Sequence, residues 1–446
     1  MSKKYQHVDK GNNMGRTALL VLIYFLYLYS FQVPGLHIGT VLPILGLLAI
    51  YTIFKFPSRT IKIGEFRTTG MVRSYWWWNV FLLLYILLLL QILGAGDGDT
   101  PVKDYIQMLI ILPLFYISGN LIFKDIKELM KILYIGVVIQ SIIIIAALLI
   151  PALSLALFLL IPEGGYNSDH FGGIDMITQY GYHIGLGVFT SAGTLKMAIG
   201  QIGAIYYLIK SRGAKLFSHL IIFFLIAIAT SVVSRTGLLI SVAGFLIVFL
   251  AKRKQSGNRA IGYITLAFSS LLIGYFIMVS VFPTTFLEDT FQRLINTADV
   301  GVKDTYFTGY IGEGGDNVIP SISPETIIGL GITNGDSGSG ITTITDGGFL
   351  RNYSAMGLIV AIINYVIIFG LFVKSYKASK VDENKIIILF MTLVLLIGEF
   401  KEYYIYYIYP MCFMFLIICL IERSEMKASC THSYILHYNR NKCVIS

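Results

Sequence analysis

The sequence predicts an all-α integral membrane protein, a polytopic bundle of about 12 transmembrane helices with a long outer loop. Its 446 residues are 56% hydrophobic and only 13% charged, whereas soluble domains are about 45–50% apolar and about a quarter charged. The composition therefore excludes a soluble enzyme and a disordered regulator. Four Cys are too few to hold together a disulfide-built secreted domain.

Apolar runs define the predicted helices. A run of about 20 apolar residues can cross the hydrocarbon core, and helices are expected because backbone groups in lipid must be hydrogen-bonded within the segment. The first run lacks a small-residue cleavage site, so we expect it to remain as an anchor. The runs are 17–33, 37–54, 76–94, 105–123, 130–150, 184–209, 217–233, 237–251, 260–283, 348–373, 385–400 and 403–421. Residues 1–446 are thus expected to form one transmembrane domain that ends in a cytoplasmic tail, 422–446.

The distribution of basic residues orients this bundle. With both termini in the cytoplasm, 27 of the 34 Lys and Arg residues fall in cytoplasmic segments, six fall outside, and Lys196 falls within a span. Cytoplasmic loops of membrane proteins carry such an excess of basic residues. The net charge of +9 therefore reflects orientation in a membrane, and no nucleic-acid partner is expected.

Two outer segments are longer than a turn. Residues 162–183 contain acidic and His residues but no Lys or Arg. Residues 284–347 form the large outer loop, which has nine acidic residues, two basic residues and a glycine-rich end. Loops longer than about 12–15 residues are usually functional or disordered, so a binding surface and a floppy solvated loop both remain open. The apolar stretch after Pro151 is too short to span, and we expect it to lie along the outer interface.

Three cations lie where the topology does not require them. Arg235 and Arg351 are near the outer ends of spans, and Lys196 is inside one; such charges usually face the bundle interior and mark a substrate or ion path. Two guanidiniums at one outer depth suit a bidentate phosphate site. The alternatives are snorkelling or pairing with an acid such as Asp346 for each Arg, and pairing with a core carboxylate or carbonyl for Lys196.

Other polar residues give weaker signals. His170 and His183 are outer candidates for a base or a ligand, although an isolated outer His is more often structural. No outer cluster has metal-ligand spacing, and the two Cys and two His of the tail match no common zinc finger. There is no P-loop, GxGxxG or GxSxG motif. Glu399 lies at the hinge of the last two spans, and the tyrosine-rich run 403–409 after it favours an interfacial belt over a sugar-stacking platform.

The order of two short motifs resembles a known family. Ser234–Arg235–Thr236–Gly237 opens one span, and after the large outer loop Asp346–Gly347–Gly348–Phe349–Leu350–Arg351 opens another, which continues to Gly357–Leu358. With about twelve spans, this arrangement resembles the O-antigen polymerases (Wzy-type), within the wider group of O-antigen ligases and related lipid-linked glycan polymerases. The resemblance covers the whole topology, but its specific residues lie only at about 234–237 and 346–358.

The resemblance implies a membrane glycosyltransferase of the GT-C type that uses no metal, no other cofactor and no nucleotide sugar. Its donor would be a glycan on undecaprenyl pyrophosphate, and its acceptor one repeat unit on a second undecaprenyl pyrophosphate. By inverting transfer at the outer face of the bacterial cytoplasmic (inner) membrane, it would extend an O-antigen, capsule or exopolysaccharide. This leaves room for a chain-length regulator and a flippase as partners.

The resemblance assigns Arg235 and Arg351 to the pyrophosphate but assigns no general base. The candidate bases and outer contacts are Glu163, Asp169, His170, His183 and Asp346. Members of the family often carry an Arg at the start of the span that here runs from 184. This chain has His183 at that point, so either Lys196 becomes the third phosphate contact or the site is built on two arginines.

Other functions remain open from the sequence alone. A ligase would transfer a finished glycan, and relatives in that group place a functional His in the large outer loop, where this chain has none. A lipid-linked oligosaccharide flippase would need charges along both halves of a central cavity and short loops. A structural or sensory role leaves the two outer arginines unexplained.

Overall fold

The computed structural model describes a mostly helical chain. The described residues are 3–33, 38–64, 66–94, 98–158, 160, 185–186, 190–256, 262, 265, 269, 322–336, 342–343, 347–401 and 403–443. The helices are α1 (Lys3–Leu28), α2 (Val41–Gly64), α3 (Arg67–Leu93), α4 (Val102–Ile122), α5 (Ile126–Leu149), α6 (Pro151–Phe158), α8 (Thr190–Lys210), α9 (Ala214–Val233), α10 (Arg235–Ser256), α14 (Pro324–Ile328), α15 (Gly348–Ala378), α16 (Asp382–Lys401), the 3-10 turn η5 (Tyr404–Tyr406) and α17 (Ile408–Cys443).

Most of the predicted spans coincide with these helices. Among the described residues, α3, α4, α5, α9, α10 and α15 are long and apolar enough to cross a membrane. The remaining predicted runs fall on α1, α2, α8, α16 and α17, except for 260–283, which lies almost entirely outside the described residues. The stretch after Pro151 forms the short helix α6, whose Leu157 packs against Ala147 of α5.

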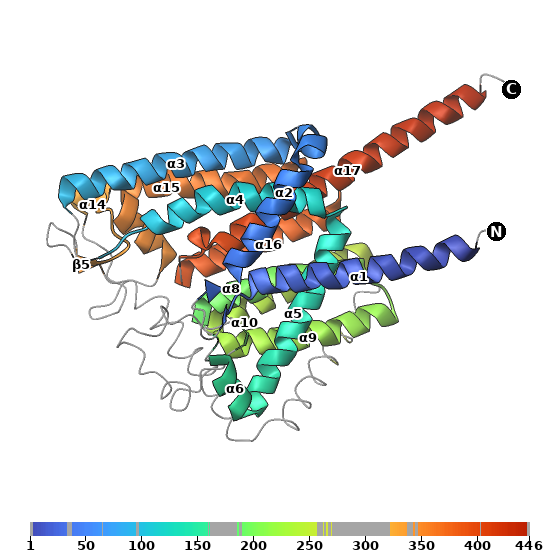
Figure 1. Ribbon diagram of the computed structural model, residues 1–446, viewed down its shortest axis with the longest axis horizontal. Coiled ribbons are helices and arrows are strands. Elements are labelled where there is room, and N and C mark those ends of the chain that lie inside the picture. Colours follow the sequence, from blue (N-terminus) through green and yellow to red (C-terminus); the bar gives the residue numbers. More distant parts are fainter. Residues whose placement is uncertain are drawn as a thin grey trace.

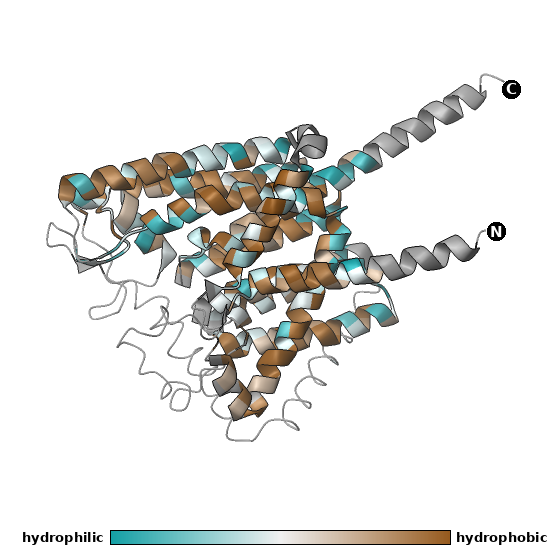
Figure 2. Cartoon of the chain, viewed as in Figure 1, coloured by the Kyte–Doolittle hydropathy of each residue, from teal (hydrophilic) through white to brown (hydrophobic). Residues whose placement is uncertain are grey.

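The helices form a bundle with two distinct ends. Both chain termini lie at one end, which we call the terminal face, and α14 lies at the opposite end, which we call the loop face (Figure 1). Hydrophobic residues line the lengths of the helices, and hydrophilic ones gather toward their ends (Figure 2).

Polar contacts join helix ends that the basic-residue pattern places on the same side. At the terminal face, Arg16 pairs with Glu128 at 2.5 Å. At the loop face, the hydroxyl groups of Ser30 and Tyr409 are 3.4 Å apart. Both contacts thus join helix ends that lie on one side in the predicted alternation.

Two helices lie at the centre of the bundle. Every residue of α17 from Met411 to Ile421 is buried, which is typical of a helix surrounded by protein on all sides. On α8, Gly203 lies so close to α5 that a Cβ atom there would be 2.6 Å from the backbone nitrogen of Tyr134. A larger residue at 203 would therefore force α8 and α5 apart.

Helix α15 is interrupted at Gly357. This residue has φ 78° and ψ 163°, a backbone conformation that essentially only glycine adopts. The break separates an N-terminal segment of α15, residues 348–356, from the longer part that follows. Two carbonyl groups before the break accept hydrogen bonds from the large outer loop. Leu330 N donates to Ser354 O at 2.7 Å, and Gly331 N donates to Ala355 O at 3.0 Å.

A small antiparallel sheet fastens the same part of the outer loop to the α3–α4 connection. Strand β4 (Asn334–Asp336) lies between β3 (Gly98–Asp99) and β5 (Thr342–Thr343). The backbone nitrogen of Thr333 also donates to Asp99 O at 2.7 Å. A separate two-stranded sheet pairs β1 (Gln32–Val33) with β2 (Ile38–Gly39) between α1 and α2. The described end of the large outer loop is thus packed on the bundle at the loop face.

Candidate functional site

Arg351 lies in the N-terminal segment of α15, at the loop face. The segment begins at Gly348, and Arg351 N donates to Gly347 O at 3.0 Å. The Arg351 side chain is half-buried, and its charge interacts with the carboxylate of Asp104 in the first turn of α4. The break at Gly357 therefore places this arginine on a short helical segment at the loop face, ahead of the longer part of α15.

Glu399 is hydrogen-bonded to Asn352, the residue that follows Arg351. Its side chain is fully buried, and its Oε1 accepts hydrogen bonds from Tyr365 Oη at 2.7 Å and from Asn352 Nδ2 at 3.0 Å. Its Oε2 accepts a hydrogen bond from Ile405 N at 3.0 Å. Since Asn352 directly follows Arg351, this carboxylate connects the arginine's helical segment to α16 and to the η5 turn.

The tyrosines of the hinge are core residues. Tyr403, Tyr404 and Tyr406 are buried in protein, and the rings of Tyr403 and Tyr406 stack with centroids 4.7 Å apart. Tyr105 packs edge-on against Tyr406 at 4.9 Å. The sequence favours an interfacial belt at this run, with a sugar-stacking platform as the alternative, but burial of these three rings leaves neither lipid nor a sugar free access to them.

Lys196 reaches toward the loop face from α8. Its Nζ donates to Ser30 Oγ at 3.4 Å and lies 5.3 Å from the ring centroid of Tyr409. Ser30 follows α1, and Tyr409 lies in the first turn of α17. The ammonium therefore lies where the loop-face ends of three helices converge.

Arg235 is the first residue of α10, also at the loop face. Its side chain lies outside the described part of the structure, but its neighbours are well defined. Ser234 Oγ and Thr194 Oγ1 are 2.5 Å apart, which ties the α9–α10 junction to α8. About two turns further along α8, Gln201 Nε2 donates to Thr230 Oγ1 at 3.0 Å and to Ser241 Oγ at 2.9 Å. These bonds fix the backbone from which Arg235 projects.

The three predicted cations therefore share one face of the bundle. Helix α16 packs against α8, α10 and α15, which carry Lys196, Arg235 and Arg351. Helices α10 and α15 both begin at this face, so the partial positive charge of their N-termini adds to that of the two arginines. Helix N-termini and arginine residues are both typical of sites for a phosphate or pyrophosphate group.

Glu163, Asp169, His170, His183 and Asp346 all lie outside the described residues. Within the described part of the chain, no three His, Cys, Asp or Glu side chains are grouped as a metal site would require.

The sequence does not single out one acidic residue of this site, Asp104, and it does not indicate the contacts of another, Glu399. Asp104 follows Lys103 at the outer end of a predicted span, and such a pair has the pattern of ordinary interfacial charges. Its proximity to Arg351 arises only from the packing of the loop face. Glu399 is conspicuous in the sequence as a hinge acid, but the pattern does not indicate its link to Asn352.

Comparison with known proteins adds no assignment to this geometry. No protein-family model, no curated protein and no solved structure matches this chain.

Proposed function

We propose that this protein is a membrane glycosyltransferase that polymerises undecaprenyl-pyrophosphate-linked oligosaccharide repeat units at the outer face of the bacterial cytoplasmic membrane. The observation that carries the proposal is the placement of Arg235 and Arg351 at one face, each near the start of a helix that packs against α16. Topology does not require an arginine at either position, and an anionic group at the membrane surface accounts for both.

In the proposed reaction, a hydroxyl group of the acceptor repeat unit attacks the anomeric carbon of the donor glycan. A new glycosidic bond forms with inversion, the bond from the anomeric carbon to the pyrophosphate oxygen breaks, and the hydroxyl proton passes to a base. Arg235 and Arg351 stabilise the negative charge that develops on the departing lipid pyrophosphate. Lys196 contributes a third positive charge deeper in the bundle.

Asp104 joins the candidate bases for this reaction. It is half-buried at the loop face, and its charge interacts with that of Arg351. A base must lie within hydrogen-bond reach of the proton it removes, and a carboxylate near the pyrophosphate-binding arginine is suitably placed. Glu399 is a poorer candidate because it is buried and accepts three hydrogen bonds already.

Alanine substitution of each arginine tests the proposal. In a strain that depends on this protein for surface polysaccharide, Arg235→Ala and Arg351→Ala are expected to abolish high-molecular-weight glycan, while single repeat units accumulate on lipid. Arg→Lys at either position is also expected to fail, since a point charge does not reproduce the bidentate guanidinium. Gel analysis of the glycan and mass spectrometry of the lipid-linked pool provide the measurement.

Matched controls lie on the same helices at the terminal face. Arg253→Ala on α10 and Lys374→Ala on α15 remove exposed cations there and are expected to leave polymer length unchanged. Polymer of normal length in both loop-face variants, with normal amounts of inserted protein, would contradict the pyrophosphate role.

The lipid-linked pool also separates the alternative functions. Loss of a ligase leaves long polymer attached to lipid, and loss of a flippase leaves single units on the cytoplasmic side. Extension of a lipid-linked repeat unit by the purified protein in the presence of a chelator would confirm that the reaction needs no metal.

A further inference from the structure

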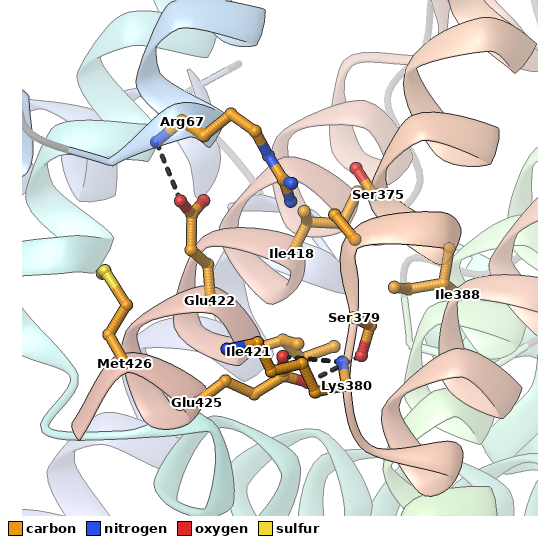
Figure 3. Close-up of a pocket in the computed structure, with 11 residues that line it drawn as sticks. Arg67, Ser375, Ser379, Lys380, Ile388, Ile418, Ile421, Glu422, Glu425 and Met426 are labelled. Carbon is orange, nitrogen blue, oxygen red and sulfur yellow. Dashed lines mark hydrogen bonds between the residues drawn. The ribbon is translucent and has the colours of Figure 1, made fainter. Parts of the chain in front are cut away.

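The terminal face contains a pocket that the proposed reaction does not use. It has a volume of about 350 Å³ and lies between α3, α15, α16 and α17 (Figure 3). Its floor is apolar and includes Ile388, Ile418 and Ile421. Charged side chains from α3, α17 and the residues after α15 line the remainder. A pocket with an apolar floor and charged walls is typical of a site for a small amphiphilic group.

One acidic side chain of the pocket, Glu422, is held by the start of α3. Its Oε1 accepts a hydrogen bond from Arg67 N at 2.9 Å. Its Oε2 accepts from Thr68 N at 3.0 Å and from Thr68 Oγ1 at 2.5 Å. The carboxylate therefore caps the N-terminus of α3 through backbone groups and leaves the Arg67 side chain uninvolved.

The other acidic side chain, Glu425, is held by the connection between α15 and α16. It accepts hydrogen bonds from Ser379 Oγ at 2.6 Å, from Asn384 Nδ2 at 2.7 Å and from Lys380 N at 2.9 Å. Here too the neighbouring cation contributes its backbone N–H. Both carboxylates are therefore fixed in place at the pocket by these hydrogen bonds.

Two cationic side chains complete the pocket. Arg67 extends across one side toward Ile418, and Lys380 extends across the opposite side (Figure 3). Within the described part of the chain, neither the Arg67 guanidinium nor the Lys380 ammonium has a hydrogen bond or ion pair. The pocket thus presents two available cations beside two fixed carboxylates, which complements a group that carries both a phosphate and a primary ammonium.

The surroundings indicate that this group belongs to a lipid. Helix α3, which begins at the pocket, is the least buried of the six apolar helices that could cross a membrane among the described residues. Its exposed side includes Trp77, Phe81, Leu84 and Leu88, whose spacing forms one stripe along the helix. Acyl chains can lie along such a stripe with the headgroup at the helix end.

We infer that this pocket binds the headgroup of a phosphatidylethanolamine-type phospholipid. Arg67 and Lys380 contact its phosphate, its ammonium donates a hydrogen bond to the remaining lone pair of Glu422, and the negative charge of Glu425 adds to the attraction. The site lies at the opposite end of the bundle from Arg235 and Arg351, so it does not depend on the proposed function.

Native mass spectrometry of the delipidated protein in detergent tests this inference. The protein is titrated with dioleoyl phosphatidylethanolamine, phosphatidylcholine or phosphatidylglycerol, and the bound lipid is identified by its mass. The ethanolamine lipid is expected to bind at least about tenfold more tightly than the choline lipid, whose quaternary ammonium cannot donate a hydrogen bond. Binding without this preference, or a preference for phosphatidylglycerol, would overturn the inference.

Alanine variants locate the site without disturbing the fold. Arg67→Ala and Lys380→Ala keep the backbone N–H groups that Glu422 and Glu425 accept from, so thermal unfolding in detergent is expected to be unchanged. The double variant is expected to bind the ethanolamine lipid at least about tenfold more weakly. Arg73→Ala and Lys377→Ala remove exposed cations from α3 and α15 outside the pocket and are expected to bind it normally. Equal binding by both pairs of variants would refute the site.

Discussion

Replacing Gly357 with alanine should detach the outer loop from α15. The φ of 78° and ψ of 163° at this position cost a non-glycine residue about 1–3 kcal/mol. An added Cβ would also lie 2.2 Å from Ile327 O and 2.3 Å from Ile328 O, and these are backbone atoms that cannot move alone. Displacing them breaks the hydrogen bonds that Leu330 N and Gly331 N donate, each worth about 0.5–1.5 kcal/mol. The total loss is about 2–6 kcal/mol.

Hydrogen exchange measures this loss where it occurs. Because about 1.4 kcal/mol is tenfold in an equilibrium constant, a local loss of about 3 kcal/mol should accelerate exchange of the Leu330 and Gly331 amides roughly 100-fold. The matched control is Gly370→Ala in the same helix, where an added Cβ would have no neighbouring atom within 4 Å. That variant should be neutral or stabilised by about 0.5–1 kcal/mol.

Equal amide protection in the two variants would show that the break at Gly357 does not depend on glycine. The packing of the outer loop on α15 would then need another cause than the carbonyl groups that the break exposes.

Three further perturbations test other contacts. Glu399→Ala leaves three hydrogen-bond donors without an acceptor, so it should destabilise the protein in thermal unfolding by about 3 kcal/mol or more. The control, Asp382→Ala, removes an exposed ion pair of the same helix and should lower the free energy of unfolding by at most about 1 kcal/mol. Burial would raise the pKa of Glu425, but its hydrogen bonds outweigh burial and hold the pKa below the ordinary 4.5. Its stabilisation is therefore complete above about pH 4.5 and is lost as the pH falls through the lower folded value. A Glu425→Gln protein cannot lose this contribution, so a variant whose stability falls with acid as steeply as that of the parent would contradict this. Gly203→Ala should disrupt the α5–α8 contact and lower the unfolding temperature, while Gly136→Ala on α5, whose Cβ would meet only one ring atom at 3.8 Å, should not.

The helices could be predicted because a membrane-spanning helix is recognisable from the amino-acid composition of its own segment. Apolar length and the excess of basic residues on one side locate each span without knowledge of its neighbours. The two shortest runs, 237–251 and 385–400, are complete helices because α10 and α16 continue into charged residues at the terminal face, among them Lys254 and Asp382. An apolar run therefore sets a minimum length for its helix.

The break in α15 could not be predicted in the same way. Gly357 stands in an apolar stretch between Met356 and Leu358, and glycine is common inside transmembrane helices. Its conformation depends on a distant segment, because Leu330 and Gly331 supply the donors that replace the missing helical ones. Nothing near residue 357 in the sequence indicates that partner.

The sequence indicates which cations belong to the candidate site, but it does not indicate the contacts that support them. Arg235 and Arg351 could be placed at one face because each departs from the basic-residue pattern. The burial of Tyr403 and Tyr406 was not predictable, because tyrosines at the end of a span suit an interface and a core equally well. Only the packing of α4 against the hinge distinguishes the two.

The sheet at the loop face has a consequence for how the protein is made. Thr333 donates its hydrogen bonds to Asp99, 234 residues earlier in the chain. During synthesis, β3 in the α3–α4 connection therefore cannot pair with β4 until most of the polypeptide has been made. Contacts between residues so far apart in the sequence form slowly. A nascent chain stopped before residue 322 would already have made α3 to α10, yet its loop face would be unfinished. Assembly of the loop face is thus a late step that follows helix insertion. This assembly can fail even when all the helices have been inserted correctly.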